Sequence, residues 1–456
     1  MGEQNNSGQM KAMAKQPRAM CKAILSGLAM VSGRGAILGA ACLFAGAISV
    51  TKAEAQSRYA CTQLDNAHVP VIEGENGNFF RVDPDLVLSH DFSEAVIERI
   101  GGLSDILAAR GTKLVVVPLP TKAIAMPDLL GPDASIYAYD RSLAATLYQD
   151  IVVRFRKAGV TTVDMRRELI GRWEDTQAFF KTDPRMTNEG LIRLVAAVSK
   201  QIPSQGPAAE NGFTTVLRGQ RDIQSHDHLV LQMSCLSALP GLETGDFITT
   251  VSDVSLLAGD APKIVYAGTN VAAHPDLNLA GFLSDAFDKA AFVINGGDRS
   301  LDALTSYLTS DAFQEAVPEV LIWELPIWEP LASGGDQPLR EVLAAAEGQC
   351  ETPLEMALLE TGGVRVDLSG TEFTANDTVY LNNANMPSQT ALFSFVASNG
   401  ESRVRSVTRS ESVQTSGRFY MPLSGLWETG AEYIDIDVPL DEAALPTVTL
   451  CRKAPS

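Results

Sequence analysis

The stretch LVVVPLP at residues 114–120 is the first of five apolar runs that decide the fold this sequence predicts. The others are TTVDM (161–165), KIVYAG (263–268), AFVING (291–296) and EVLIWELP (319–326). Continuous runs of β-favouring residues are typical of strands buried on both faces of a parallel sheet. Helical patterns alternate with them, near 94–109, 138–158, 187–201, 278–289 and 300–315. This alternation predicts a three-layer α/β domain with a parallel sheet.

The pattern changes after about residue 345. The segments GVRVDL, DTVYLNN, TALFSFVAS, SRVRSVTR, GRFYMPL, EYIDIDV and TVTLC are short and alternating, with Gly, Asn, Ser and Pro between them. Such segments predict an antiparallel β-sandwich. We therefore expect an α/β domain over residues 56–345 and a β-sandwich over 346–456. The stretch Ser333–Pro338 and the short helix after it are expected to link them.

Residues 1–55 have the features of a signal peptide. A polar, basic stretch precedes the apolar run at 36–50, and Ala53-Glu54-Ala55 follows as a small-x-small cleavage signal. The run has about 15 residues, fewer than the roughly 20 that span a bilayer. Cleavage after Ala55 and a periplasmic location are expected, with a retained N-terminal anchor as the alternative.

The charge balance is acidic. The chain carries 36 Lys and Arg against 55 Asp and Glu, a net charge of -19. Residues 1–55 hold six basic and two acidic side chains, so their removal changes the net charge to -23. A nucleic-acid binder with a broad basic surface is therefore not expected. The chain has only five histidines, which limits histidine-dependent chemistry.

Four cysteines remain after the leader, an even number that suits two disulfides in an oxidising compartment. The sequence permits three pairings. We favour the one that gives one bridge to each half of the chain, and free thiols are the alternative. The favoured bridges are Cys61–Cys235 and Cys350–Cys451.

Ligands of a doubly wound sheet collect beyond the carboxyl ends of its strands. The residues at those positions here are Thr121-Lys122, Gly268-Thr269-Asn270, Asn295-Gly296-Gly297-Asp298 and Glu324. A further polar segment, 181–190, precedes a predicted helix, and Thr187 is a suitable N-cap for it.

Four segments carry a resemblance to a known family: LVVVPLPTKA, FFKTDPRMTNEGLIRLV, KIVYAGTNVA with LAGFLSDAF, and LTSYLTSDAF with EVLIWELP. They resemble the periplasmic AlgX and AlgJ family of alginate biosynthesis. The resemblance implies an SGNH-hydrolase-like, flavodoxin-like domain that transfers acetyl groups to an exopolysaccharide. The second domain makes the layout more similar to AlgX, implies carbohydrate binding there, and fits the favoured cysteine pairing.

The chain departs from the family at two of three triad positions. The family's segment Thr-Asp-x-His is here Thr182-Asp183-Pro184-Arg185, and its Gly-Thr-Ser ends in Asn270. Asp183 is retained. An Asn carboxamide is not a competent nucleophile, and a permanently protonated Arg cannot act as general base. The resemblance therefore implies a protein of polysaccharide modification or secretion that has lost catalysis.

Alternatives remain for each of these positions. A relocated nucleophile such as Thr269, with His274 as base and Ser284 nearby, would keep the chain an acetyltransferase. Arg185 forms either a salt bridge with Asp183 or a contact with a uronate carboxylate. The segment Asn295-Gly296-Gly297 either supplies oxyanion-hole donors or only shapes a turn.

The remaining expectations concern ligands. His226 and His228 form a His-x-His pair that we expect in a surface turn, and no metal or cofactor is expected. The expected partners are an acidic or neutral, alginate-like exopolysaccharide and other polysaccharide-export or O-acetylation proteins, with the chain a monomer; a structural envelope protein is a further alternative. Candidate carbohydrate-binding residues of the second domain, which could equally be core or rim, are Thr378, Tyr380, Arg409, Arg418, Tyr420 and Trp427.

Overall fold

The computed structural model describes residues 57–452 except 68, 172–176, 203–211, 258–262, 332–336, 349, 351, 385, 412, 428–429 and 442–443. The predicted signal peptide lies outside the described residues, and so do residues 333–336 of the predicted linker. Residues 55–456 form one compact unit. No helix in the described part is long and apolar enough to cross a membrane.

A five-stranded, fully parallel sheet forms the centre of the first domain, as predicted. Its strands are β3 (Lys113–Leu119), β4 (Thr161–Thr162), β7 (Ile264–Gly268), β8 (Ala291–Asn295) and β9 (Val320–Pro326). Their order is β4-β3-β9-β7-β8. All five predicted apolar runs are therefore strands of one sheet, although only two residues of the second run pair.

Helices cover both faces of this sheet, which confirms the three layers. They are α1 (Glu94–Ala109), α2 (Lys122–Ala125), α3 (Arg141–Lys157), α4 (Met165–Leu169), α5 (Asn188–Ser199), α7 (Leu279–Phe287), α8 (Ser300–Leu308), α9 (Asp311–Glu315) and α10 (Gln337–Glu347). Leu114 and Val116 pack with α1, α3, α8 and α10, whereas Val115 and Val117 pack with α4, α5 and α7. The alternating side chains of one strand thus enter two separate cores.

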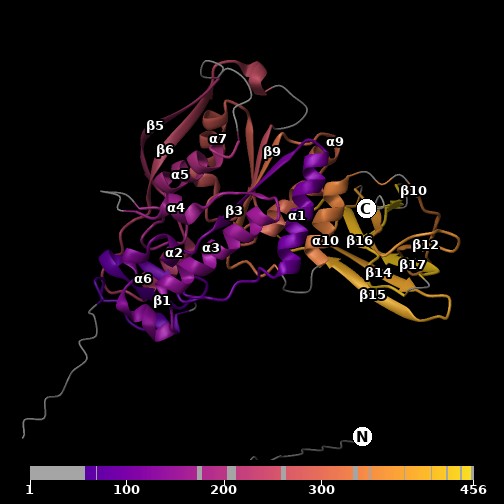
Figure 1. Ribbon diagram of the computed structural model, residues 1–456, viewed down its shortest axis with the longest axis horizontal. Coiled ribbons are helices and arrows are strands. Elements are labelled where there is room, and N and C mark those ends of the chain that lie inside the picture. The colour runs from indigo at the N-terminus through magenta and orange to yellow at the C-terminus, as the bar shows by residue number, and fades with distance from the viewer. Residues whose placement is uncertain are drawn as a thin grey trace, which may run out of the picture. The chain divides into compact units, whose positions relative to one another are not determined.

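The predicted linker helix is part of the core. In α10, Leu339, Val342 and Ala345 are fully buried, and the helix lies beside α1 (Figure 1). The expected domain boundary at residue 345 falls inside this helix. The domain limits themselves remain a prediction.

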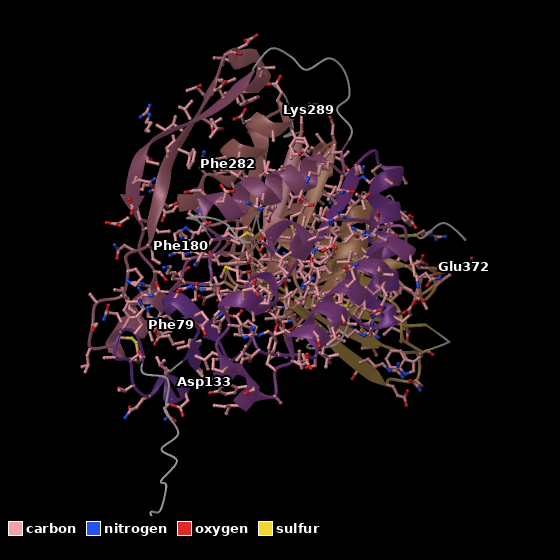
Figure 2. The ribbon with its side chains drawn as sticks, turned by 60° about the vertical axis from the view of Figure 1, so that its left-hand side comes forward. Phe79, Asp133, Phe180, Phe282, Lys289 and Glu372 are labelled. Atoms are coloured by element: carbon pink, nitrogen blue, oxygen red, sulfur yellow. A yellow bond between two sulfur atoms is a disulfide. The ribbon has the colours of Figure 1, made fainter. Side chains whose placement is uncertain are left out.

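Two parts of the first domain carry no clear sequence signal. A short hairpin joins β1 (Val71–Glu73) to β2 (Phe79–Arg81). A long antiparallel pair, β5 (Phe213–Asp222) with β6 (Glu243–Val251), has α6 (His226–Met233) between its strands. Phe247 of β6 packs edge-on against Phe282 of α7, with ring centroids 4.9 Å apart. Figure 2 labels Phe282.

The second domain is an antiparallel β-sandwich, as predicted. One sheet has the order β10-β18-β13-β16 and the other β11-β12-β17-β14-β15. The strands are β10 (Thr352–Pro353), β11 (Met356–Leu358), β12 (Val364–Asp367), β13 (Thr378–Asn382), β14 (Thr390–Val396), β15 (Ser402–Thr408), β16 (Arg418–Pro422), β17 (Tyr433–Asp437) and β18 (Thr447–Cys451). Alternate residues such as Val379, Leu381, Phe393 and Ile434 fill the space between the sheets.

Both favoured disulfides are present. Cys61 is bonded to Cys235, and Cys350 is bonded to Cys451. The first bridge ties the start of the described chain to the residues after α6. Its surroundings form a small separate hydrophobic cluster that includes Phe79 and Leu231 (Figure 2).

Candidate functional site

The site predicted from the strand ends is a cleft of about 440 Å³ beyond the carboxyl ends of β7, β8 and β9. The cleft brings together residues from segments far apart in the sequence. Its lining includes Asp183, Arg185, Thr269, Asn270, His274, Gly297 and Asp298. Asp183, Arg185 and Asn270, the three positions that the family resemblance assigns to a triad, thus line one cavity.

The loop that carries Asp183 and Arg185 is held at both ends. Phe179 and Met186 form an isolated antiparallel bridge, and the Met186 N–H donates to the carbonyl of Val271 at 2.8 Å. Thr187 then caps α5, since its hydroxyl accepts from the Gly190 N–H at 3.2 Å. The predicted N-cap is confirmed, and it fixes the loop against the segment after β7.

Arg185 is a buried side chain that connects this loop to neighbouring segments through hydrogen bonds. Its Nε donates to Asp183 Oδ1 at 2.8 Å and its Nη2 donates to Asp183 Oδ2 at 3.2 Å. Nη2 also donates to the carbonyl of Gln224 at 3.0 Å, and Nη1 lies 3.4 Å from Nε2 of His274. The two partner side chains are 6% and 1% exposed. Two roles were predicted for Arg185, and the structure shows the salt bridge with Asp183.

The charge of Arg185 affects both of its neighbours. Burial alone would raise the pKa of Asp183, but the hydrogen bonds and charge of Arg185 outweigh it, and the pKa is lowered. Burial, and next the charge of Arg185, lower the pKa of His274. Asp183 is therefore ionised and His274 neutral at physiological pH.

Asn270 is also bonded within the site. Its backbone N–H donates to the carbonyl of Gly297 at 2.7 Å, and its Oδ1 accepts from Asn295 Nδ2 at 2.8 Å. Its Nδ2 lies 3.5 Å from Oδ1 of Asp298. The carboxamide therefore joins the segments after β7 and β8.

The backbone donors after β8 do not form an oxyanion hole. The Gly296 N–H donates to the carbonyl of Gly268 at 2.9 Å, and the Gly297 N–H donates to Asn295 Oδ1 at 2.9 Å. The oxyanion-hole hypothesis is therefore wrong for this arrangement, because a stabilising donor has to point at the developing charge. Gly296 and Gly297 shape the turn instead, and Gly297 has a φ of 70°.

The hydroxyl of Thr269 bonds Glu324 and not His274, the base considered for it. Thr269 Oγ1 donates to Oε1 of Glu324 at 2.5 Å, and Tyr266 Oη donates to Oε2 of Glu324 at 2.9 Å. Burial raises the pKa of Glu324 to about 7. The carboxyl lies so close to β7 that a Cβ on Gly268 would be 2.4 Å from its Oε2. His274 instead contacts Arg185, so the proposed Thr269–His274 dyad is not assembled in this structure.

Sequence reasoning missed three contributors to the cleft. Arg81 ends β2, Trp328 follows β9, and Asp227 lies in the first turn of α6. Arg81 bonds Asp85 and lies 5.8 Å from the ring of Trp328. Arg81 and Asp227 reach the cleft through the short hairpin and the insertion between β5 and β6, which no local pattern indicated.

The His-x-His pair does not lie in a surface turn, so that prediction is wrong. His226 and His228 begin α6, which Ser225 caps, and His228 Nδ1 is hydrogen-bonded to Thr182 Oγ1 at 2.8 Å. Among the residues that the structure describes, no group of three or more His, Cys, Asp and Glu side chains could hold a metal ion.

The candidate carbohydrate-binding residues do not form one open surface. Thr378, Arg409 and Tyr420 are 5%, 7% and 1% exposed. Arg409 Nη2 donates to Glu341 Oε1 at 2.6 Å in a buried ion pair with α10. Burial removes these three residues from any contact with a polymer, which corrects the prediction for them.

The other three candidates have different surroundings. Arg418 is paired with Asp311, and its Nε donates to the hydroxyl of Tyr380 at 3.0 Å. Tyr380 stacks on Tyr420 with ring centroids 4.6 Å apart. Only Trp427 lies partly exposed at a distance from these contacts, with the Arg403 guanidinium 4.5 Å from its ring.

Comparison with known proteins identifies the family. The family model described as "SGNH hydrolase-like domain, acetyltransferase AlgX" matches residues 71–327. The chain belongs to this family. The match covers all five strands of the parallel sheet and every residue that lines the cleft except Trp328, and it ends before the β-sandwich.

Individual relatives agree with this assignment. The alginate biosynthesis protein AlgX of Pseudomonas aeruginosa is 29% identical over 264 residues, 56% of this chain and 55% of the relative. The probable alginate O-acetylase AlgJ of the same organism is 27% identical over 260 residues, 51% of this chain and 63% of the relative. The chain thus matches little more than half the length of these curated relatives.

A solved structure of Pseudomonas aeruginosa AlgX is similar to the whole described fold. It has a TM-score of 0.69 and 22% identity, and the similarity covers 88% of this chain and 98% of that chain. The two-domain architecture of α/β domain and β-sandwich is therefore the AlgX fold.

Proposed function

We propose that this chain is an exported, AlgX-like protein of alginate or related exopolysaccharide biosynthesis that binds the polymer without transferring acetyl groups to it. In this proposal it acts in the periplasm, with other polysaccharide-export or O-acetylation proteins, during modification or secretion of the polymer. We also propose that the α/β domain covers residues 56–345 and the β-sandwich domain residues 346–456.

One observation supports the proposed loss of catalysis: each side chain at the three triad positions is hydrogen-bonded to another protein group. Arg185 forms a salt bridge with Asp183. The Asn270 side chain is hydrogen-bonded to Asn295 and Asp298. The N–H of Gly297 donates to Asn295 within the turn. Acyl transfer needs a nucleophile, a base and donors aimed at the reacting carbonyl. No residue at these positions supplies the first two.

The two disulfides support an oxidising compartment, because structural disulfides are rare in reducing ones. The periplasm is such a compartment, and it is where the predicted cleavage after Ala55 would release the chain.

Polymer binding requires local positive charge, since the chain as a whole is strongly acidic. Arg185, Arg409 and Arg418 are paired with carboxylates and do not meet this need. The edge of the β-sandwich offers other arginines. Arg403 and Arg405 both come from β15, and their Nη1 atoms donate to the carbonyls of Gly425 at 2.7 Å and Pro422 at 2.9 Å, so the two guanidinium groups lie against the same segment.

Trp427 completes this surface. Its ring lies under Arg403, and its Nε1 donates to Glu401 at 3.0 Å. An aromatic ring beside clustered guanidinium groups suits a sugar face and a uronate carboxylate together. Trp427 is therefore the one originally predicted carbohydrate residue that we retain.

Hydrolysis of a chromogenic acetyl ester tests the catalytic half of the proposal. We expect the unmodified protein to release p-nitrophenol no faster than a heat-unfolded sample, and an Asn270→Ser, Arg185→His double variant to exceed it. The single variants are the matched controls, because each restores only half of the missing chemistry. Turnover by the unmodified protein well above the unfolded sample contradicts the proposal.

The same assay decides the relocated-nucleophile alternative. That alternative requires activity in the unmodified protein and its loss in Thr269→Val and His274→Ala variants. The bond from Thr269 to Glu324 and the contact of His274 with Arg185 argue against it.

A further inference from the structure

A second cavity opens beside the cleft. It has a volume of about 180 Å³, and we call it the side chamber. The two cavities have lining residues in common, so they adjoin each other. The shared residues are Arg81, Asp183, Pro184, His226 and Asp227.

The walls of the side chamber are largely apolar. Val69 and Val71 come from the segment before and in β1, Phe79 from β2, and Val230 and Leu231 from α6. The Cys61–Cys235 disulfide joins the chain before β1 to the residue just beyond α6. The two sides of the chamber are thereby covalently tied.

Most polar side chains that line the chamber are already bonded to protein: Arg81 bonds Asp85, and Thr182 Oγ1 is hydrogen-bonded to His228. Lys122 Nζ donates to the carbonyls of Phe180 at 2.5 Å and Lys181 at 2.9 Å. Burial lowers the pKa of Lys122 to about 7, so its charge is partial near neutral pH. Asp183 is held by Arg185, as described above. The chamber therefore favours an apolar group over a hydrogen-bonding one.

The size of the chamber limits its occupant. A dry apolar cavity of about 150 Å³ is known to hold a benzene-sized molecule. The side chamber thus holds a small apolar group and excludes a long lipid chain. The cleft is lined by charged and amide side chains. A ligand that fills both cavities therefore has a polar part in the cleft and a small apolar substituent in the side chamber.

We propose that the side chamber binds the short acyl ester substituent of a sugar whose ring lies in the adjoining cleft. Acyl esters place a small apolar group on an otherwise polar sugar. This inference rests on the polymer binding proposed above and adds to it that the chain prefers O-acetylated polymer to the unacetylated form.

Calorimetric titration with one oligosaccharide in two forms tests this preference. The probes are an O-acetylated uronate hexamer and the same hexamer after mild alkaline deacetylation. Burial of one acetyl methyl group predicts about 4- to 10-fold tighter binding of the acetylated form. Equal affinities, or tighter binding of the deacetylated form, overturn the inference.

Filling the chamber separates this inference from the proposed function. A Val230→Phe variant fills the chamber from α6, and its affinities for the two hexamers should become equal. Leu229→Phe adds the same ring on the same helix at a side chain that is 54% exposed, and it should keep the preference. If Val230→Phe does not fold by circular dichroism, Ala67→Leu fills the chamber from the opposite wall.

The outcomes are distinct. Binding of both hexamers with equal affinity contradicts the side-chamber inference and leaves polymer binding intact. Binding of neither hexamer contradicts the proposed function, and with it this inference. A preference that survives in both the Val230→Phe and Ala67→Leu variants shows that the acetyl group binds elsewhere and also overturns it.

Discussion

Arg185 holds both oxygens of Asp183, with Nε 2.8 Å from Oδ1 and Nη2 3.2 Å from Oδ2. The two side chains are 6% and 1% exposed, so the ion pair is buried. Removing one member of a buried ion pair leaves an unpaired buried charge, which costs more than an exposed pair contributes. We therefore expect the pair to stabilise the loop between Phe179 and Met186.

An Arg185→Met variant should lower the free energy of unfolding by about 3–5 kcal/mol, because it leaves Asp183 buried and unpaired. Denaturant titration measures the change. Adding Asp183→Asn should recover part of the loss, since the remaining charge is removed.

The matched control is Lys200→Met, which breaks an ion pair with Glu168 in which the lysine side chain is 61% exposed. Its cost should stay below about 1 kcal/mol. Equal effects of the Arg185 and Lys200 variants would contradict a special role for the buried pair.

The buried carboxyl of Glu324 should make stability depend on pH. Its pKa is raised from 4.5 to about 7, so the folded protein holds this proton more tightly than the unfolded chain does. Stability should therefore fall as the pH rises from about 4.5 to 7, by up to about 3 kcal/mol, with the cost fully present above that window.

Glu324→Gln should remove this part of the pH profile, measured by denaturant unfolding at pH 4.5, 6 and 7.5. Glu372→Gln, at an exposed position, removes the same charge and should leave the profile unchanged. The prediction fails if the Glu324 variant keeps the slope of the unmodified protein.

The Cys350–Cys451 bridge closes a loop across 101 residues of the β-sandwich region. Replacing both cysteines by serine should lower the free energy of unfolding by about 2–5 kcal/mol, because the unfolded chain regains conformational freedom. Thermal unfolding with and without reductant gives the control. The difference between variant and unmodified protein should shrink when both are reduced, and a difference that persists would assign the effect to packing.

Glu341 and Arg409 join α10 to the β-sandwich in a buried pair. Glu341→Ala should cost about 3–5 kcal/mol of stability, because the guanidinium is left buried without its partner. Asp435→Ala breaks the pair with Arg365, whose side chain is 43% exposed, and should cost about 1 kcal/mol or less. Similar losses in both variants would contradict the interpretation that Arg409 is structural.

Trp427 is expected to contact polymer. Trp427→Ala should weaken binding of the uronate hexamer by about fivefold, since a stacking ring contributes about 1 kcal/mol. The matched control is Tyr433→Ala, whose ring also lies under an arginine, Arg365, but one that Asp435 already pairs. Unchanged affinity in the Trp427 variant would remove the sandwich edge from the binding surface.

Much of the fold could be predicted because its signals are local. The apolar run that begins at Leu114 is a central strand, and Thr187 caps a helix, since burial on both faces and N-capping each depend on a few neighbouring residues. The hairpin of β5 and β6 gave no such signal. Most of β5 is exposed, so it lacks the alternation that indicates a half-buried strand.

The candidate site could be predicted in part. The strand-end rule brought Asp183, Arg185 and Asn270 into one cleft, but it said nothing about Arg81, which arrives from a distant short hairpin. The spacing of Thr378 and Tyr380 indicated a shared strand face, yet it could not tell which surface covers that face.

From the sequence alone one could predict the two-domain architecture and name the residues at the positions that the family resemblance assigns to a triad, because these follow from local patterns and residue types. The sequence favoured one of three disulfide pairings, and the structure shows that this pairing is the one present. Only the tertiary structure decided how the residues at the triad positions bond. The sequence left open whether Arg185 binds a ligand. In the structure its guanidinium contacts Asp183, His274 and the Gln224 carbonyl. The reason is physical: a buried polar group takes whichever partner the packed chain brings within reach, and those partners lie up to 89 residues away.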